Sequence, residues 1–361
     1  MRPFLLATIF MRRLVLTLAA VFCSTLVFAQ AFASFDAPGA GTGVYQGTFP
    51  VSVNDKGGIA GYYADNSNIR HGFLRKPDGE FTTFTPPNLS GILVVAMNNG
   101  GQILGTGTLP NPYSNVAFLR HPAGYFAVFS PASASNTTPC SLNNTGEVTG
   151  YFQDAAYVYH GFLRTSDGNI TVIDDPEVAL SDGKGTFACA INDRGEIAGY
   201  YNDQRTGGVR AFIRDETGHF INFDAIVGGS AGLHISAINS AGEVVGQFWN
   251  TSLDTQGFLR DSSGTITDFA VTGTNLTVTT GINDSGTVVG LWDDSQLYRQ
   301  GFQRDTAGNI TTFSAPDFNY GTVFAGINNH GTITGYCTDL NYISHGFVFR
   351  QPSAGGKTSG R

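Results

Sequence analysis

Charge is scarce in this chain. Only 13% of its 361 residues are Asp, Glu, Lys or Arg, whereas a typical soluble domain has about 25%. Cysteine is scarce too, because the four that are present are too few for a disulfide framework in a domain of this length. Hydrophobic residues make up 41% of the chain, so a packed core must hold the fold.

Motifs of cofactor binding are also missing, because the sequence contains no phosphate-binding loop. Its one Gly-x-Ser-x-Gly match, at residues 228–232, carries no weight in a chain so rich in glycine. Its His and Cys residues do not follow the spacings of metal ligands. We therefore predict no catalytic residue, no metal site and no cofactor.

Glycine, by contrast, is abundant, with 47 residues, roughly twice the usual share. Its frequent recurrence excludes long helices, because each interior glycine costs a helix about 1 kcal/mol. Collagen is excluded because glycine does not recur at every third position. The 47 Gly and 14 Pro together stay below the ~25–30% that is typical of low-complexity disorder. The composition therefore predicts strands joined by tight turns.

Residues 1–31 are predicted to be a secretory signal peptide. Three arginines (Arg2, Arg12 and Arg13) precede an apolar run over residues 14–29, which is shorter than the ~20 residues needed to span a membrane. A signal-peptidase pattern follows, with cleavage expected after Ala29 or Ala31, and an uncleaved anchor is the alternative. The mature protein is expected to be extracellular or periplasmic, with no integral membrane span.

The mature protein is expected to be acidic. Removal of residues 1–31 takes away three arginines and no acid, leaving 17 Lys and Arg against 28 Asp and Glu, or a net charge of −11. A protein with this charge binds nucleic acids and anionic membranes poorly. We therefore expect no nucleic-acid partner.

The rest of the chain consists of seven copies of one unit. The first marker of the unit is an Asn followed by Gly three and seven residues later. These asparagines, 44–49 residues apart, are Asn54, Asn98, Asn143, Asn192, Asn239, Asn283 and Asn328. The second marker is an Arg that ends an aromatic-containing strand: Arg75, Arg120, Arg164, Arg214, Arg260, Arg304 and Arg350. Two markers that keep the same phase over seven copies indicate a genuine repeat.

Each copy is expected to form four short antiparallel strands, which we denote A to D. Strand A ends at the marker Asn, a tight Asn–Gly turn leads to strand B, strand C ends at the marker Arg, and a second glycine turn leads to strand D. Four strands in a repeat of this length are typical of β-propeller blades. We therefore predict one all-β domain, a seven-bladed β-propeller, over residues 32–352.

The two ends of the repeat region complement each other. The seventh copy stops after Arg350 without a strand D, and residues 32–38 resemble the strand D of the sixth copy, which ends at Pro316. The N-terminal strand is therefore predicted to complete the last blade and close the ring, which protects the sheet edges. Residues 353–361 are expected to be a disordered tail, and the protein is expected to be a monomer.

The unit resembles the HAF repeat of bacterial extracellular proteins, which is named for a His-Ala-Phe tripeptide. At this position the seven copies read His71-Gly72-Phe73, Val116-Ala117-Phe118, His160-Gly161-Phe162, Arg210-Ala211-Phe212, Gln256-Gly257-Phe258, Gln300-Gly301-Phe302 and His345-Gly346-Phe347. The resemblance covers nearly the whole mature chain. It implies an extracellular repeat protein, and it implies no particular activity.

Three copies place an Asp six residues before the His that opens strand C. The pairs are Asp65 with His71, Asp154 with His160, and Asp339 with His345. Such pairs serve catalysis or metal binding in some proteins, but pairs spread around a ring do not converge on one substrate. We predict that they clasp the B–C hairpin, since an unpaired buried polar group costs about 1–3 kcal/mol.

The seven marker arginines are also predicted to be structural, because an anion-binding site would need one or two of them. Glu147, Glu196 and Glu243 begin strand B. We expect them to pair across the strands with Arg164, Arg214 and Arg260. Cys140 and Cys189 occupy the same position in neighbouring copies and are expected to stay free thiols.

Five tyrosines in the predicted B–C loops are candidate ligand contacts: Tyr113, Tyr157, Tyr159, Tyr298 and Tyr342. Tyr45, Phe318 and Tyr320 lie in predicted D–A loops, which emerge on the same face of a propeller. Aromatic side chains on this face are suited to stacking on sugars or to binding a protein. The alternative is that they pack over the rims of the blades.

Two classes of function follow from these observations. We predict a binding or scaffold module for a carbohydrate or for another extracellular protein. The alternative is an extracellular polysaccharide lyase or hydrolase with its site on the same face. Catalysis needs convergent charged residues or inserted loops, whereas the predicted loops are short, the longest being Asp174–Gly185. Binding is therefore favoured over catalysis.

Overall fold

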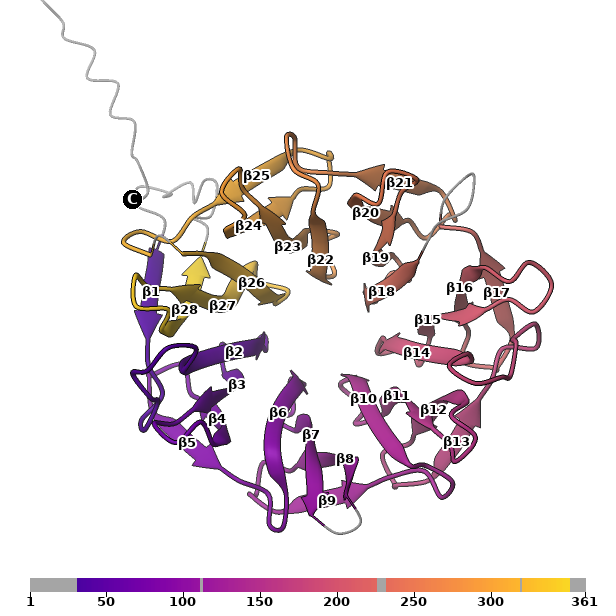
Figure 1. The fold of residues 1–361 in the computed structure, drawn as a ribbon, viewed down its shortest axis with the longest axis horizontal. Coiled ribbons are helices and arrows are strands. Elements are labelled where there is room, and N and C mark those ends of the chain that lie inside the picture. Colours follow the sequence, from indigo (N-terminus) through magenta and orange to yellow (C-terminus); the bar gives the residue numbers. More distant parts are fainter. Residues whose placement is uncertain (1–30, 111–112, 226–231, 319, 351–361) are drawn as a thin grey trace, which may run out of the picture.

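The computed structural model describes residues 31–110, 113–225, 232–318 and 320–350. Within these ranges the chain forms strands and no helix, and the strands are arranged in a ring around a central axis (Figure 1). The protein is therefore an all-β propeller, as the sequence predicts. Apart from Ala31, the predicted signal peptide lies outside the described residues, and so does the predicted tail, 353–361. No helix in the described part of the chain is long and apolar enough to cross a membrane.

Five sheets within these ranges contain four strands each, and consecutive strands in them pair antiparallel. The first two are β6 (Ser90–Met97), β7 (Ile103–Pro110), β8 (Tyr113–Arg120) and β9 (Phe126–Phe129), then β10 (Asn136–Leu142), β11 (Val148–Gln153), β12 (Tyr159–Arg164) and β13 (Ile170–Ile173). The third and fourth are β14 (Thr186–Ile191), β15 (Ile197–Asn202), β16 (Val209–Arg214) and β17 (Phe220–Phe223), then β18 (Leu233–Ile238), β19 (Val244–Trp249), β20 (Thr255–Arg260) and β21 (Ile266–Phe269). The fifth is β22 (Thr277–Ile282), β23 (Val288–Asp293), β24 (Arg299–Arg304) and β25 (Ile310–Phe313).

The remaining sheet has eight strands and contains both ends of the repeat region. One part is β26 (Thr322–Ile327), β27 (Thr332–Thr338), β28 (Ser344–Arg350) and β1 (Ala31–Phe35), and the other is β2 (Gly47–Val53), β3 (Ile59–Ala64), β4 (Arg70–Arg75) and β5 (Phe81–Phe84). A single parallel pair, Gly47 with Ser344, joins the two parts.

The prediction of seven separate four-stranded blades is wrong where the two ends of the repeat region meet. Five of the described sheets have four strands and one has eight. The physical reason is the close approach of two backbones. Gly47 has a φ of +115°, and a Cβ atom at this position would overlap the carbonyl group of Ser344. Glycine at position 47 lets the two backbones lie this close, so the joining pair forms here.

The predicted closure of the ring by the N-terminal strand is confirmed. Strand β1 pairs antiparallel with β28 through five residue pairs, from Ala31–Arg350 to Phe35–Gly346, and the two lie side by side in Figure 1. The ring of Phe32 stacks on that of Phe347 with centroids 5.0 Å apart. Strand β28 therefore has a partner on its outer edge.

The core is built from one phenylalanine in each repeat, the last residue of the strand-C tripeptide. All seven are 0% exposed: Phe73, Phe118, Phe162, Phe212, Phe258, Phe302 and Phe347. The second marker glycine lies opposite each phenylalanine, as Gly105 does opposite Phe118. A Cβ atom at Gly105 would overlap the Phe118 ring, so the buried ring requires the glycine. Burial of each phenylalanine contributes about 1.5–3 kcal/mol.

The marker asparagines link neighbouring repeats around the axis. In each, Oδ1 accepts a hydrogen bond from the backbone N–H four residues later. The side-chain Nδ2 donates to the carbonyl oxygen of the marker Asn in the next repeat, at 2.9–3.3 Å. The seven bonds form a closed circle. The sequence predicts only a turn at these positions, so this second role is an addition from the structure.

The predicted Arg–Glu pairs are wrong. Arg164 is opposite Val148 in the register of β11 and β12, and Glu147, one residue earlier, lies just outside the paired strand. Its carboxylate instead accepts a 2.8 Å hydrogen bond from the marker Asn143. The guanidinium of Arg164 lies over the ring of Phe129 at 4.8 Å, and burial lowers the pKa of this arginine. Arg260 lies over Phe223 in the same way, at 5.0 Å.

Candidate ligand-binding face

The loop face is the side of the ring that carries the B–C and D–A connections. Ring contacts show that both kinds of loop meet there. Tyr298, from the β23–β24 loop, lies 5.0 Å from Tyr320, from the β25–β26 loop. Tyr342, from the β27–β28 loop, lies 5.9 Å from Tyr45, from the β1–β2 loop. The two loop sets therefore emerge on one face.

Four of these tyrosines form a continuous line, which we call the tyrosine row. It runs Tyr45–Tyr342–Tyr320–Tyr298, with ring centroids 5.9, 4.7 and 5.0 Å apart. Tyr45 is 75% exposed and Tyr342 is 41% exposed, whereas Tyr320 and Tyr298 are half-buried. The row thus presents aromatic surface to solvent while its members support one another.

The turn 339–343 holds Tyr342 in place. The carboxylate of Asp339 accepts 2.9 Å hydrogen bonds from the backbone N–H groups of Asn341 and Ile343, and the N–H of Tyr45 donates to the carbonyl oxygen of Tyr342 at 2.8 Å. Tyr342 and Tyr45 have φ angles of +61° and +63°. This left-handed conformation costs a residue with a side chain about 1–2 kcal/mol, and such strain is common at binding sites.

The tyrosine row also affects the ionisation of Tyr342. Its pKa is raised above the usual value, chiefly by the neighbouring Tyr320, with smaller effects from Tyr298 and Tyr45. The phenol therefore stays protonated across the neutral range. It can donate a hydrogen bond from its hydroxyl as well as offer its ring.

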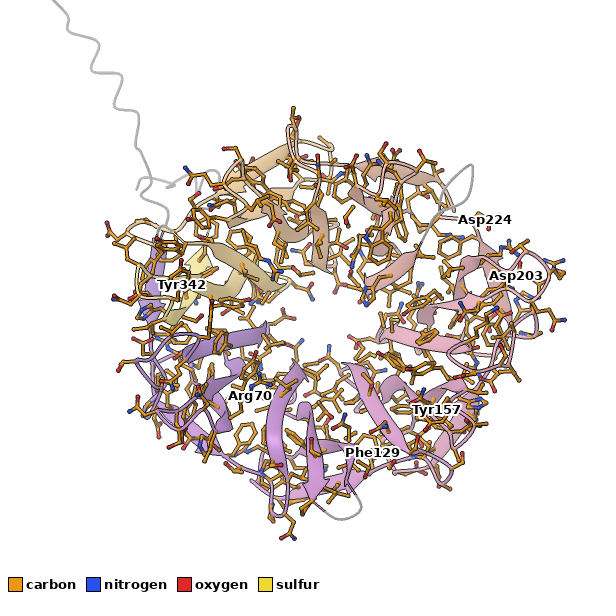
Figure 2. All side chains as sticks on the ribbon, viewed as in Figure 1. Arg70, Phe129, Tyr157, Asp203, Asp224 and Tyr342 are labelled. Atoms are coloured by element: carbon orange, nitrogen blue, oxygen red, sulfur yellow. The ribbon has the colours of Figure 1, made fainter. Side chains whose placement is uncertain are left out.

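The five candidate tyrosines do not form one site. Tyr298 and Tyr342 belong to the tyrosine row, whereas Tyr157 lies in another part of the ring, near β12 and β13 (Figure 2). Tyr159, two residues further on, is half-buried, with its ring 4.9 Å from Phe187. It packs between two repeats. The side chain of Tyr113 lies outside the described residues.

Sequence reasoning missed two exposed residues of the loop face, Leu253 and Leu297. They are 72% and 79% exposed, with φ angles of +66° and +64°. Each stands three residues after the Asx residue that begins its B–C turn, as Tyr157 and Tyr342 do. The signal was present in this repeated spacing, since a large apolar residue is unusual where a turn needs positive φ.

The loop face differs from the opposite face in its apolar surface. Among the described residues fourteen large hydrophobic side chains are exposed, and nine of them lie in the loops of this face. These nine are Val44, Tyr45, Ile69, Tyr157, Leu180, Leu253, Leu297, Leu340 and Tyr342. Exposed apolar surface concentrated on one face is typical of an interaction surface.

The same loops are strongly acidic. Their described residues include thirteen acids and two bases, Lys184 and Arg205. The acids are Asp36, Asp65, Asp154, Asp174, Asp175, Glu177, Asp182, Asp203, Asp224, Asp254, Asp294, Asp317 and Asp339. A polyanionic ligand would be repelled by this face.

The predicted Asp–His pairs lie close together in all three copies, but only His71 and Asp65 are within hydrogen-bond distance. The His Nε2 to Asp carboxylate distances are 3.3 Å for His71–Asp65, 3.6 Å for His160–Asp154 and 3.8 Å for His345–Asp339. Each histidine also uses its Nδ1, which lies 2.8–3.0 Å from Thr85, Asp174 or Asp36 after a strand D. These histidines therefore tie the B–C loop to the outermost strand.

A charged cluster lies on the loop face of the sheet β14–β17. Figure 2 shows Asp203 and Asp224 near its outer strands. Arg210 Nε lies 2.7 Å from Asp224, and its Nη1 lies 3.2 Å from Glu177. Glu177 also accepts hydrogen bonds from Arg205 and from the hydroxyl of Tyr201, at 3.0 and 3.1 Å. The cluster ties the long 174–185 loop to the sheet.

The cysteines and the metal-ligating residue types form no reactive site in the described part of the chain. Cys140, Cys189 and Cys337 are free thiols, as predicted for the first two. Burial raises the pKa of Cys140 to about 12, so it is not a nucleophile at neutral pH. Among the described residues no group of three or more His, Cys, Asp or Glu side chains is arranged to hold a metal ion.

Comparisons with known proteins support the fold. No protein-family model matches the chain, and no curated protein matches it in sequence. It is similar to the β-propeller domain of the Trilobed protease from Pyrococcus furiosus, at 11% identity over 77% of this chain and 84% of that one, with a TM-score of 0.53. It is also similar to a puromycin hydrolase mutant, at 13% identity over 85% of this chain and only half of that one, with a TM-score of 0.52. At these identities the likeness concerns the propeller fold alone.

Proposed function

We propose that the protein is an exported propeller that binds a carbohydrate through its loop face. The tyrosine row is the observation that carries this proposal. Its partly exposed rings offer apolar faces for the C–H surfaces of sugar rings, and their hydroxyls can meet the polar edges. The contacts among Tyr45, Tyr342 and Tyr320 hold these rings before a ligand arrives, which reduces the entropy lost on binding.

The carbohydrate is favoured over a protein ligand by the shape of the aromatic surface. The tyrosine row is a single line of four rings at spacings of 4.7–5.9 Å, which suits a narrow, extended ligand. The acids of the surrounding loops can accept hydrogen bonds from hydroxyl groups. Their net negative charge disfavours uronic or sulfated polysaccharides.

A hydrolase or lyase acting on the same face is the second candidate. One observation favours it: burial raises the pKa of Asp175, as in a general acid. Asp175 is only 1% exposed, however, so a polysaccharide could not reach its carboxyl without movement of the 174–185 loop. Binding therefore stays the first proposal.

We also propose that the chain is a HAF-repeat protein whose residues 1–31 direct export, and that it functions as a seven-bladed ring. The repeated strand-C tripeptides support the first point. The closed circle of seven asparagine hydrogen bonds supports the last, since each bond joins equivalent turns. In this interpretation the eight-stranded sheet acts as two blades linked at Gly47.

The test of carbohydrate binding is a screen of the mature protein against neutral, amino-sugar and uronic oligosaccharides, followed by calorimetry on the hits. We expect binding to neutral or amino sugars and none to uronates. The absence of any glycan hit would contradict the proposal. Release of reducing sugar by the wild type, lost in Asp175→Asn, would establish the enzyme instead.

A further inference from the structure

A separate cavity lies on the loop face beside the tyrosine row. It has a volume of about 230 Å³ and is lined by Gly273–Leu276 of the β21–β22 loop, by Asp293–Ser295 and by Leu297. Drug-sized ligands occupy pockets of about 300–1,000 Å³. A cavity of this size therefore suits a single small unit, such as one monosaccharide, and not a whole oligosaccharide.

One hydrogen-bond acceptor in the lining of this cavity has no partner in the described part of the chain. The Oδ1 atom of Asp293 is buried and has no hydrogen-bond partner in the described part of the chain. Burial raises the pKa of Asp293, and the charge of Arg299 opposes this effect. A buried acceptor without a partner costs about 1–3 kcal/mol, so a rotation of the Asp293 side chain that brings this oxygen to a ligand donor would relieve that cost.

The neighbouring polar groups of the lining already form hydrogen bonds within the protein. Asp294 accepts bonds from the backbone of Gln296 and Tyr298 and from the side chain of Gln300, so it orders the turn. Thr274 bonds within its own loop, and the carbonyl of Asn275 accepts a 2.9 Å bond from Thr255. The cavity walls are thus fixed by their own hydrogen bonds, which leaves Asp293 as the acceptor that awaits a partner.

Apolar groups and charge define the rest of the cavity. Leu297 projects from a left-handed turn position, with a φ of +64°, and Leu276 lies on the facing loop. No Lys or Arg is among the lining residues. The lining therefore combines two carboxylates with aliphatic surface, which fits a ligand that carries hydrogen-bond donors and C–H faces, and which repels an anion.

The cavity and the tyrosine row share one turn. Leu297 lines the cavity, and the next residue, Tyr298, forms the end of the row through its contact with Tyr320. We propose that the cavity is a subsite for one donor-rich hexose, neutral or amino, of an oligosaccharide whose remaining units lie along the tyrosine row. This inference rests on the proposed carbohydrate-binding function and specifies which kind of sugar unit occupies the cavity at the end of the tyrosine row.

The test uses the mature full-length protein and titration calorimetry with three probes: a neutral hexose oligomer, a glucosamine oligomer and a uronate oligomer. Asp293→Asn keeps the size of the side chain and removes its charge, and Leu297→Gly removes the apolar wall and relieves the backbone strain. We expect each variant to weaken binding of the preferred oligomer about tenfold. Tyr125→Ala, which removes an exposed side chain from the opposite face, serves as the control and should bind as the wild type does.

The outcomes separate the two proposals. If Tyr342→Ala abolishes binding while Asp293→Asn and Leu297→Gly bind normally, the cavity is not a subsite and the carbohydrate function stands. If the wild type binds no oligomer, both proposals fail. Tighter binding of the uronate than of the other probes would overturn the assigned ligand class. A preference for glucosamine that N-acetylation abolishes identifies an ammonium group as the donor, and equal binding after acetylation identifies hydroxyls.

Discussion

The side-chain Nδ2 of Asn328 donates a 2.9 Å hydrogen bond to the carbonyl oxygen of Asn54, which lies 274 residues earlier. Six equivalent bonds join the other turns in sequence order, so this one completes the circle between the last repeat and the first. Both residues are buried, at 5% and 8% exposure. A polar side chain in such a position stabilises the ring only while its partners are present.

Asn328→Ala is expected to lower the free energy of unfolding by about 1–3 kcal/mol, because the carbonyl of Asn54 and the N–H of Thr332 lose a buried partner. Thermal unfolding should show a Tm lower by a few degrees. Asn192→Ala, at an internal position of the circle, should cost the same. Asn309→Ala is the control, since Asn309 is exposed and its side chain bonds only to Asp305. Equal Tm values for all three variants would contradict a role for the circle.

Deletion of residues 32–38 is expected to lower the Tm by more than about 10 °C, because it removes several kcal/mol of packing and pairing. The deletion leaves the outer edge of β28 without its partner and removes the ring that stacks on Phe347. The change is measured by scanning calorimetry of the mature protein. Deletion of 353–361, which should leave the Tm unchanged, is the matched control. An unaltered Tm after the first deletion would show that β1 does not hold the ring closed.

Substitutions in the tyrosine row should separate stacking from hydrogen bonding. Tyr342→Ala removes the ring between Tyr45 and Tyr320 and should weaken glycan binding at least tenfold, or about 1.4 kcal/mol. Tyr342→Phe keeps the ring and should lose less. Affinity is measured by titration calorimetry. Tyr125→Ala, which removes an exposed tyrosine stacked on His121 in a C–D turn of the opposite face, should leave affinity unchanged.

Stability should depend on pH through Asp175. Burial raises its folded-state pKa above the usual 3.8, so the folded protein holds this proton more tightly than the unfolded chain does. The resulting stability is fully present below pH 3.8 and is lost as the pH rises through the raised pKa. Asp175→Asn mimics the protonated form and should raise the Tm relative to the wild type at pH 7, with a smaller difference at pH 4. A constant difference at both pH values would contradict the raised pKa.

The repeat architecture could be predicted from sequence because its causes are local. The glycine opposite Phe118 and the turn at Asn98 each depend on residues close in the chain, and both recur in phase. Closure by β1 was also predictable, because a missing strand at one end matched an extra strand at the other.

The errors arose where a side chain meets another repeat. Glu147 was expected to face Arg164, but a strand places successive residues on opposite faces, and the arginine lies over Phe129 from the neighbouring strand D. The second hydrogen bond of each marker Asn reaches the next repeat, and nothing in one copy indicates it. Gly47 in β2 and Ser344 in β28 are neighbours in space but lie near opposite ends of the repeat region, so nothing in either repeat alone indicates that they pair.

The candidate site was predicted only in part. Tyr298 and Tyr342 could be assigned to one face from their loops. Their ring contacts with Tyr320 and Tyr45 could not be predicted, because they depend on which loops are neighbours around the ring. The cavity beside Leu297 had no sequence signal of its own, since it forms where two loops of different sheets leave space between them.

The pairing of Ala31 with Arg350 places the first and last described residues of the chain on adjacent strands. Strand β1 therefore has no pairing partner until the rest of the chain has been synthesised and β28 has formed. If the chain crosses a membrane unfolded, as the proposed export implies, the ring can close only after β28 has crossed too. The seam between β1 and β28 therefore cannot form before β28 has been synthesised, and a product that ends before β28 cannot close the ring.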